Sequence, residues 1–199
     1  QANHSFSMHG ISTSGVKIDV KSMVKRKDNI VDQLTGGIKS LFKKNKVTLL
    51  PGHGKFVGRE DDRWLVDVNG EVIAATHVVV ATGSKPRHLP GIPVDNVTIC
   101  DNTGALAVDS VPKRLGVIGA GVIGLELGSV WKRLGAEVTI LEALPDFLAA
   151  ADAAVAKEAW KVFTQKQGLA IQLGVKITKV TSSKKGVSIA YDLADEAKV

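Results

Sequence analysis

Three glycines and one carboxylate carry the clearest chemical signal in this sequence. Gly119, Gly121 and Gly124 have the spacing GxGxxG, and Glu142 follows 23 residues after the first of them. In such a motif the first glycine makes a tight turn and the second leaves room for a pyrophosphate beside the backbone. The third lets a helix pack closely on a strand. The spacing alone is a weak signal, so its value depends on the elements around it.

The segments on both sides of the glycines fit a nucleotide site. Residues 114–119 predict a strand that leads into the motif, residues 121–134 predict a helix that opens from it, and residues 137–142 predict the next strand. A helix N-terminus offers unpaired N–H groups and partial positive charge to a diphosphate. A carboxylate at Glu142 can accept the ribose hydroxyls of NAD and would repel the 2′-phosphate of NADP. The sequence therefore predicts NAD binding. The alternative is a plain strand–turn–helix corner with Glu142 on the surface.

The first half of the chain predicts a long helix followed by short strands. Apolar residues recur at helical steps over residues 20–46, and Asp19 can cap the start of that helix. Residues 64–75 alternate around Asn69-Gly70, which is typical of a β-hairpin. The β-branched run at 77–81 shows no alternation and predicts a strand buried on both faces. The prolines and glycines of residues 82–93 exclude a helix there.

The second half predicts alternating strands and helices. Residues 94–113 form a connector, and we expect a domain boundary near Lys113. Beyond the strand that ends at Glu142, we expect a helix near 152–167 and strands around 171–178 and 187–191. This order is the one expected of βαβ units in an α/β fold with a parallel sheet.

Composition narrows the class of protein. The chain has 199 residues, of which 44% are hydrophobic and 23% are charged, as in an ordinary globular domain. Its one cysteine, Cys100, excludes an intrachain disulfide and a CxxC redox pair, so we expect an inert thiol and a reducing, cytoplasmic location. The five histidines show no metal-ligand spacing, so we expect no metal. No apolar run is long enough to cross a membrane, and the lack of an initiator Met indicates a fragment.

The formal net charge of +6 is concentrated near the N-terminus. Residues 1–60 hold 11 Lys and Arg against four Asp and Glu. Nucleic-acid binding is one interpretation, because basic side chains neutralise phosphates. A solvated helix face is the simpler interpretation, since aromatic side chains for base stacking are missing among these lysines. We therefore expect no nucleic-acid partner.

Longer stretches around the glycine motif resemble one enzyme family. Residues 118–142, together with 81–91 and 101–116, resemble the dihydrolipoamide dehydrogenases, which are flavoprotein disulfide reductases that bind two dinucleotides. Residues 50–58 and 166–180 are similar to this family as well. The glycine motif would also fit the wider class, which includes glutathione and mercuric reductases. The TGAL link at 103–106, Gly124 and Glu142 favour the dihydrolipoamide dehydrogenases.

The resemblance implies a Rossmann-like architecture with FAD and NAD as cofactors. Residues 1–113 would be the later part of an FAD-binding domain, and residues 114–199 a truncated NAD-binding domain. The NAD residues that it implies are Gly119, Ala120, Gly121, Val122, Ile123, Gly124, Leu125, Glu126, Glu142 and Ile177. The FAD residues that it implies are Gly54, Thr82, Gly83 and Ser84.

The same resemblance implies an activity for the parent enzyme. That enzyme would oxidise protein-bound dihydrolipoamide and pass the electrons through FAD to NAD. It would be a homodimer bound to the lipoyl acyltransferase core of a 2-oxo acid dehydrogenase complex, such as the pyruvate dehydrogenase complex. We expect no catalytic residue in this chain, which has one cysteine and so lacks the redox-active pair. The alternatives are another flavoprotein disulfide reductase and a non-catalytic NAD-binding module.

Overall fold

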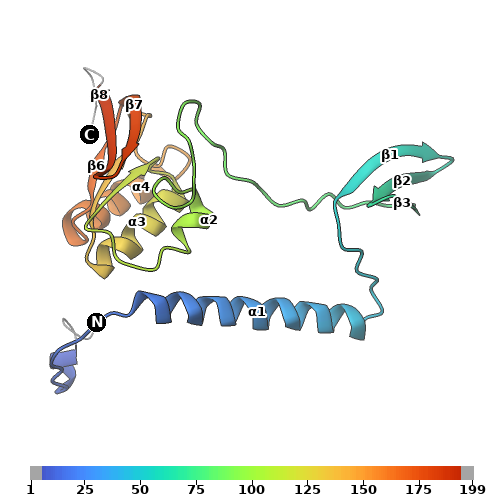
Figure 1. Ribbon diagram of the computed structural model, residues 1–199, viewed down its shortest axis with the longest axis horizontal. Coiled ribbons are helices and arrows are strands. Elements are labelled where there is room, and N and C mark those ends of the chain that lie inside the picture. Colours follow the sequence, from blue (N-terminus) through green and yellow to red (C-terminus); the bar gives the residue numbers. More distant parts are fainter. Residues whose placement is uncertain (1–5, 194–199) are drawn as a thin grey trace. The chain divides into compact units, whose positions relative to one another are not determined.

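The computed structural model describes residues 6–193, which divide into two compact units (Figure 1). One unit combines the residues up to Lys25 with those from Pro86 onward, and the other comprises Arg26–Lys85. Helix α1, Val20–Lys44, begins in the first unit and continues into the second. A short 3₁₀ helix, Phe6–His9, precedes it. The domain assignment with a boundary near Lys113 stays a prediction.

Helix α1 confirms the helix predicted over residues 20–46 and its cap, although it ends at Lys44 and Val20 is its only buried residue. The Asp19 carboxylate accepts a hydrogen bond from the Ser22 backbone N–H at 3.0 Å and another from the Ser22 hydroxyl at 2.7 Å. These bonds stabilise the carboxylate and lower the pKa of Asp19. Neither α1 nor any other helix among residues 6–193 is long and apolar enough to cross a membrane.

The unit Arg26–Lys85 contains a three-stranded antiparallel sheet in the order β1-β2-β3. Its strands are β1 (Gly54–Glu60), β2 (Arg63–Val68) and β3 (Glu71–Ala75). The predicted hairpin is confirmed, because Asn69 and Gly70 join β2 to β3 with φ values of 55° and 91°. Such a pair of positive φ values is what a two-residue hairpin turn of this kind requires.

The predicted buried strand at residues 77–81 is wrong. These residues form an irregular segment, and the exposed fractions of Val79 and Val80 are 89% and 69%. A strand buried on both faces needs hydrogen-bonded neighbours, and among residues 6–193 no strand pairs with this run. Consecutive β-branched residues favour a buried strand, but such a strand also needs neighbouring strands to pair with. Sequence composition does not show whether those neighbours are present.

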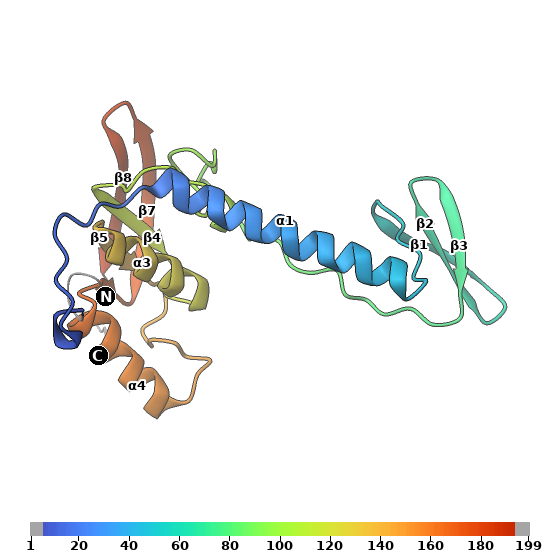
Figure 2. The ribbon, with the colours of Figure 1, turned by 90° about the horizontal axis from the view of Figure 1, so that it is seen from below.

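The other unit is built on a parallel sheet in the order β4-β5-β6, which confirms the α/β prediction. Its strands are β4 (Arg114–Ile118), β5 (Glu137–Leu141) and β6 (Ala170–Gln172). Helix α3, Val122–Leu134, connects β4 to β5. Helix α4, Ala153–Lys161, and a π-helix, Val162–Lys166, connect β5 to β6. Figure 2 shows β4 and β5 side by side with α3 against them.

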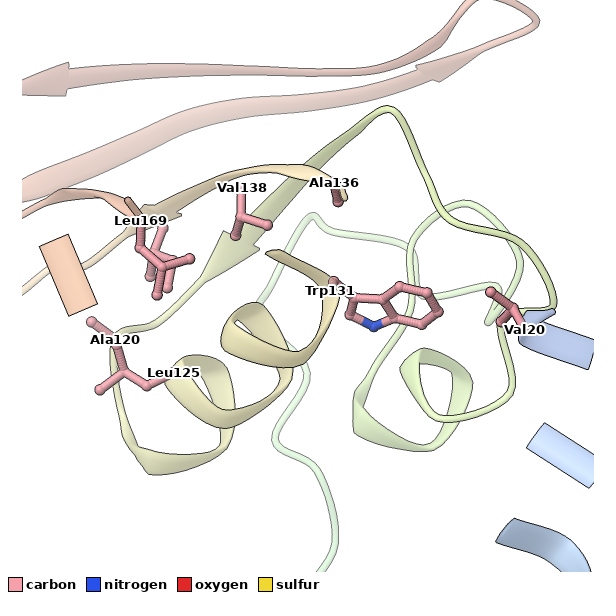
Figure 3. Close-up of a cluster of buried hydrophobic side chains, with 8 residues drawn as sticks. Val20, Ala120, Leu125, Trp131, Ala136, Val138 and Leu169 are labelled. Carbon is pink, nitrogen blue, oxygen red and sulfur yellow. The ribbon is translucent and has the colours of Figure 1, made fainter. Parts of the chain in front are cut away.

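Close contacts at two glycines show which element covers each face of the sheet β4-β5-β6. A Cβ on Gly128 of α3 would lie 3.2 Å from Ile140, so the helix backbone approaches that face closely. A Cβ on Gly116 would lie 3.1 Å from Ile189, which belongs to strand β8 (Gly186–Leu193). The core lies between α3 and the sheet (Figure 3), with Trp131 pointing toward Val20. Its buried residues are Val20, Ala120, Leu125, Trp131, Ala136, Val138, Ile140 and Leu169.

The last strands differ from the prediction in two respects. The single strand expected at 171–178 is split into β6 and β7 (Val175–Ser183), because Gly174 has a φ of 65° and turns the chain. Strand β8, Gly186–Leu193, pairs with β7 antiparallel, so this end of the chain is a hairpin and not a further βαβ unit. Hydrophobic periodicity carries no information about such a backbone turn.

The connector at 94–113 contains a short helix, α2, Asn102–Ala105. The Asp101 carboxylate caps it by accepting hydrogen bonds from the N–H groups of Thr103 and Gly104 at 2.8 and 3.3 Å. Asp101 also lies 3.3 Å from the Nε2 atom of His88. Burial acts to raise the pKa of Asp101, but the bonds from His88, Gly104 and Thr103 lower it overall.

Gly104 is expected to be sensitive to any side chain. A Cβ at Gly104 would collide with the Asn96 side chain, whose Oδ1 accepts a hydrogen bond from the Asp101 N–H at 3.1 Å. Gly104→Ala should therefore destabilise the chain by about 1–3 kcal/mol, as overpacking does. Gly36→Ala is the matched control, because a Cβ there meets no atom within 4 Å inside α1. It should stabilise the helix by roughly 0.5–1 kcal/mol. Thermal unfolding measures both, and equal effects of the two variants would contradict the prediction.

Candidate dinucleotide-binding site

The glycine motif forms a tight turn between β4 and α3. Gly119 has a φ of 102° and donates its N–H to the Leu141 carbonyl at 2.8 Å, which ties the turn to β5. A Cβ on Gly124 would collide with the Gly119 carbonyl oxygen. The first turn of α3 can therefore lie against the loop only because residue 124 is glycine.

Gly121 lies on the open side of the turn. It is the N-cap residue of α3, makes no side-chain capping bond and has an extended backbone, with φ of −70° and ψ of 174°. A Cβ at this position would meet no atom within 4 Å. Val122 and Ile123, which follow it, have exposed fractions of 64% and 58%. The N-terminus of α3 thus presents unpaired N–H groups beside open space, which suits an anion.

The Glu142 carboxylate lies directly against the glycine loop. Its Oε2 atom accepts a hydrogen bond from the Ala120 N–H at 2.6 Å, and its Oε1 atom accepts one from the Leu144 N–H at 2.9 Å. Ala120 is 22 residues away in the sequence, so the parallel pairing of β4 and β5 brings the two groups together. The two hydrogen bonds hold the carboxylate at the carboxyl end of β5, the central strand of the sheet.

The other predicted NAD residues differ in their surroundings. Leu125 is buried in the core with an exposed fraction of 2%, and its N–H bonds to the Gly121 carbonyl at 3.0 Å. Its side chain therefore supports α3 from inside. Glu126 is exposed on the same helix. Ile177 is half-buried on β7 opposite Tyr191.

The predicted FAD residues all lie in the unit Arg26–Lys85 and are exposed. Gly54 is the first residue of β1 and pairs with Val68. Thr82, Gly83 and Ser84 follow the irregular valine run, and Gly83 has a φ of 71°. Their backbone is therefore accessible, whereas the buried strand that was expected to lead into them is missing.

Cys100 has the surroundings of an unreactive thiol. It is half-buried, and burial raises its pKa, as do the negative charges of Asp95 and Asp101. The thiolate, which is the reactive form, is thereby disfavoured. Within residues 6–193 no group of three His, Cys, Asp or Glu side chains could hold a metal ion. His4 lies outside the described residues.

Sequence patterns missed two backbone contacts beside Glu142. Leu144 donates its N–H to the carboxylate, and its carbonyl accepts a hydrogen bond from the Gly174 N–H at 3.0 Å. Because both contacts use main-chain atoms, the type of residue at position 144 gives no signal for them. At position 174 the glycine is itself a signal, because glycine is the residue that most readily adopts a positive φ.

Residues 3–199 match a protein family described as pyridine nucleotide-disulphide oxidoreductase. The chain belongs to this family. The family confirms the Rossmann-like fold, and membership together with the relatives implies FAD and NAD as cofactors. Curated relatives named dihydrolipoyl dehydrogenase, a synonym of dihydrolipoamide dehydrogenase, confirm the resemblance to that family.

Two relatives illustrate the similarity of this oxidoreductase chain. It is 61% identical over 188 residues to a dihydrolipoyl dehydrogenase of Cupriavidus necator, with 94% of this chain and 40% of the relative covered. It is 44% identical over 196 residues to the mitochondrial dihydrolipoyl dehydrogenase 1 of Arabidopsis thaliana, with 98% and 38% covered. The chain therefore spans about two fifths of the length of these relatives.

Solved structures agree with the fold. LpdA of Mycobacterium tuberculosis matches 95% of this chain and 42% of its own, with a TM-score of 0.82 at 23% identity. The flavoprotein disulfide reductase RclA of Escherichia coli matches 89% of this chain and 40% of its own, with a TM-score of 0.70 at 26% identity. The glycine turn fits the dinucleotide that such oxidoreductases use, because the space beside Gly121 is open and the α3 N-terminus faces it.

Two alanine substitutions should separate the packing and binding roles of the turn. Gly124→Ala should destabilise the chain by about 1–3 kcal/mol, because its Cβ collides with the Gly119 carbonyl. Gly121→Ala should leave stability nearly unchanged and weaken NADH binding about tenfold, because its Cβ enters the open space where the glycine motif predicts a pyrophosphate. Thermal unfolding and titration calorimetry measure the two effects. If Gly121→Ala bound NADH as tightly as the unchanged chain, the space beside Gly121 would not be where a pyrophosphate binds.

Proposed function

We propose that this chain supplies the NAD site and part of the FAD site of a dihydrolipoyl dehydrogenase. The observation that carries the proposal is the Glu142 carboxylate, which accepts a hydrogen bond from Ala120 at 2.6 Å beside the open space at Gly121. The 61% identity to a dihydrolipoyl dehydrogenase over 94% of the chain supports the choice of this enzyme within the family.

The proposed NAD contacts follow from the chemistry of the turn. The pyrophosphate binds beside Gly121, where it meets the N–H groups and partial positive charge of the α3 N-terminus. Glu142 accepts hydrogen bonds from the adenosine ribose hydroxyls, and its negative charge repels the 2′-phosphate of NADP. Glu126 approaches the nicotinamide ribose side, and Ile177 packs near the adenosine half. Glu126 is exposed on α3, which supports a contact between its side chain and a bound nucleotide.

The proposed FAD contacts rest on the family resemblance together with exposed backbone. Gly54 brings the backbone close to the FAD adenine, and Thr82, Gly83 and Ser84 line the flavin nucleotide. All four residues are accessible in the unit Arg26–Lys85. When FAD and NAD are bound, they supply the hydride chemistry, and the residues of this chain bind and orient them.

The proposed enzyme oxidises protein-bound dihydrolipoamide and reduces NAD. The names of the relatives support this substrate. We further propose that the enzyme acts as a homodimer on the lipoyl acyltransferase core of a 2-oxo acid dehydrogenase complex, such as the pyruvate dehydrogenase complex. The single cysteine of the chain supports a reducing, cytoplasmic compartment.

Reversing the charge at position 142 tests the NAD assignment. Glu142→Arg should weaken NADH binding and strengthen NADPH binding, so that their affinity ratio shifts by about tenfold or more toward NADPH. The reason is that arginine attracts the 2′-phosphate that the carboxylate repels. Titration calorimetry with both nucleotides measures the ratio.

Glu137→Arg is the matched control for this experiment. Glu137 is exposed and is the first residue of β5, whereas Glu142 follows its last residue, Leu141. Both variants change the net charge equally, but only one acts at the glycine loop. If Glu142→Arg shifted the ratio no more than Glu137→Arg does, Glu142 would not hold the ribose.

The chain by itself should not oxidise dihydrolipoamide. A redox-active disulfide needs two cysteines, and the sequence has only Cys100, whose pKa is raised by burial and by neighbouring carboxylates. The purified 199-residue chain, mixed with dihydrolipoamide, FAD and NAD, should therefore give no absorbance increase at the NADH band above the protein-free rate. Steady NADH production would show that the chain contains a complete catalytic centre.

A further inference from the structure

We infer that Gly174 is a positioning residue for the Glu142 carboxylate and thereby contributes to the preference for NAD over NADP. Gly174 lies in the two-residue connector between β6 and β7, which end and begin at Gln172 and Val175. The inference rests on the proposed NAD site, because it concerns the same carboxylate.

The residues on either side of this connector, Gln172 and Val175, both form hydrogen bonds with the backbone of Glu142. The Glu142 N–H donates to the Gln172 carbonyl at 2.8 Å, and the Glu142 carbonyl accepts a hydrogen bond from the Val175 N–H at 2.8 Å. The residues before and after the connector thus hold position 142 at the end of β5. The main chain of Glu142 is fixed even though its side chain reaches into the site.

The side chain of Glu142 is held through Leu144. The Gly174 N–H donates to the Leu144 carbonyl at 3.0 Å, and the Leu144 N–H donates to the Glu142 Oε1 atom at 2.9 Å. The other carboxylate oxygen, Oε2, accepts the hydrogen bond from Ala120 in the glycine loop at 2.6 Å. A continuous series of hydrogen bonds therefore runs from Gly174 through Leu144 and Glu142 to Ala120.

The direction of the Gly174 N–H depends on its backbone conformation. Gly174 is buried and has a φ of 65°, in the left-handed region that β-branched residues disfavour most and asparagine tolerates. A residue that leaves this region turns its N–H away from Leu144. Leu144 then no longer fixes Oε1, and the carboxylate can move away from the position where it excludes a 2′-phosphate.

The test compares Gly174→Val with Gly174→Asn and with Gly168→Val. Gly168 is a matched control, because its φ of 69° is nearly the same but it is exposed and lies before β6, at the opposite end of that strand. The readout is the ratio of NADPH to NADH dissociation constants from titration calorimetry. The fraction of folded chain cancels in this ratio. Hydrogen exchange of the Leu144 and Ala120 amides gives a second readout that needs no nucleotide.

Gly174→Val should lower the ratio about tenfold and speed exchange of the Leu144 amide, since small displacements of a positioned group have effects of this order. Gly174→Asn and Gly168→Val should keep the ratio within about twofold of the wild type. If Gly174→Val does not fold, Gly174→Ala replaces it, with a smaller change in the same direction.

The outcomes separate this inference from the proposed function. An unchanged ratio and unchanged Leu144 exchange in Gly174→Val would overturn the inference, as would an equal change in Gly168→Val. Glu142→Gln is included to test the site itself. If Glu142→Gln leaves the ratio unchanged, the NAD assignment fails, and Leu144 exchange alone then decides whether Gly174 holds the carboxylate. Faster exchange in Gly174→Val but not in Gly174→Asn supports the positioning role.

Discussion

The hydrogen bond from the Ala120 N–H to the Glu142 carboxylate imposes the main constraint on this structure. It joins groups 22 residues apart, so it can form only if β4 and β5 are parallel neighbours. It also requires that α3 return the chain to the correct end of the sheet, which depends on close packing at Gly124 and Gly128. The site is therefore a consequence of how one βαβ unit packs, and its rigidity comes from the core beneath it.

The core and the site occupy opposite sides of the same backbone. Val138 and Ile140 are almost completely buried under α3, with exposed fractions of 1% and 0%. The first turn of α3 instead leaves Val122 and Ile123 exposed. Tight packing on one side holds the turn in shape, while the other side stays open to a ligand. This division explains why a buried residue such as Leu125 can matter to the candidate nucleotide site, which its side chain does not line.

Local patterns predicted the elements whose stability is local. The Asp19 cap and the Asn69-Gly70 turn were predictable because the chemistry lies within a few residues. The position of Glu142 beside the glycine loop was predictable, because the motif places the ends of two neighbouring strands close together. The run at 77–81 was not, because burial depends on neighbours that periodicity cannot supply. The break at Gly174 was missed for a similar reason, since hydrophobic spacing does not report a positive φ.

The valine run at residues 77–81, which follows β3 in the chain, lies next to an open edge of the sheet β1-β2-β3. Strand β3 is an edge strand, so within residues 6–193 one row of its N–H and C=O groups pairs with no other strand. Val72 on that strand and Val79 and Val80 beyond it have exposed fractions of 55%, 89% and 69%. An open edge next to β-branched apolar side chains is a template on which another extended chain can add as a strand. Among residues 6–193, the free edge of β3 is therefore a place where a further extended strand would lengthen the sheet β1-β2-β3.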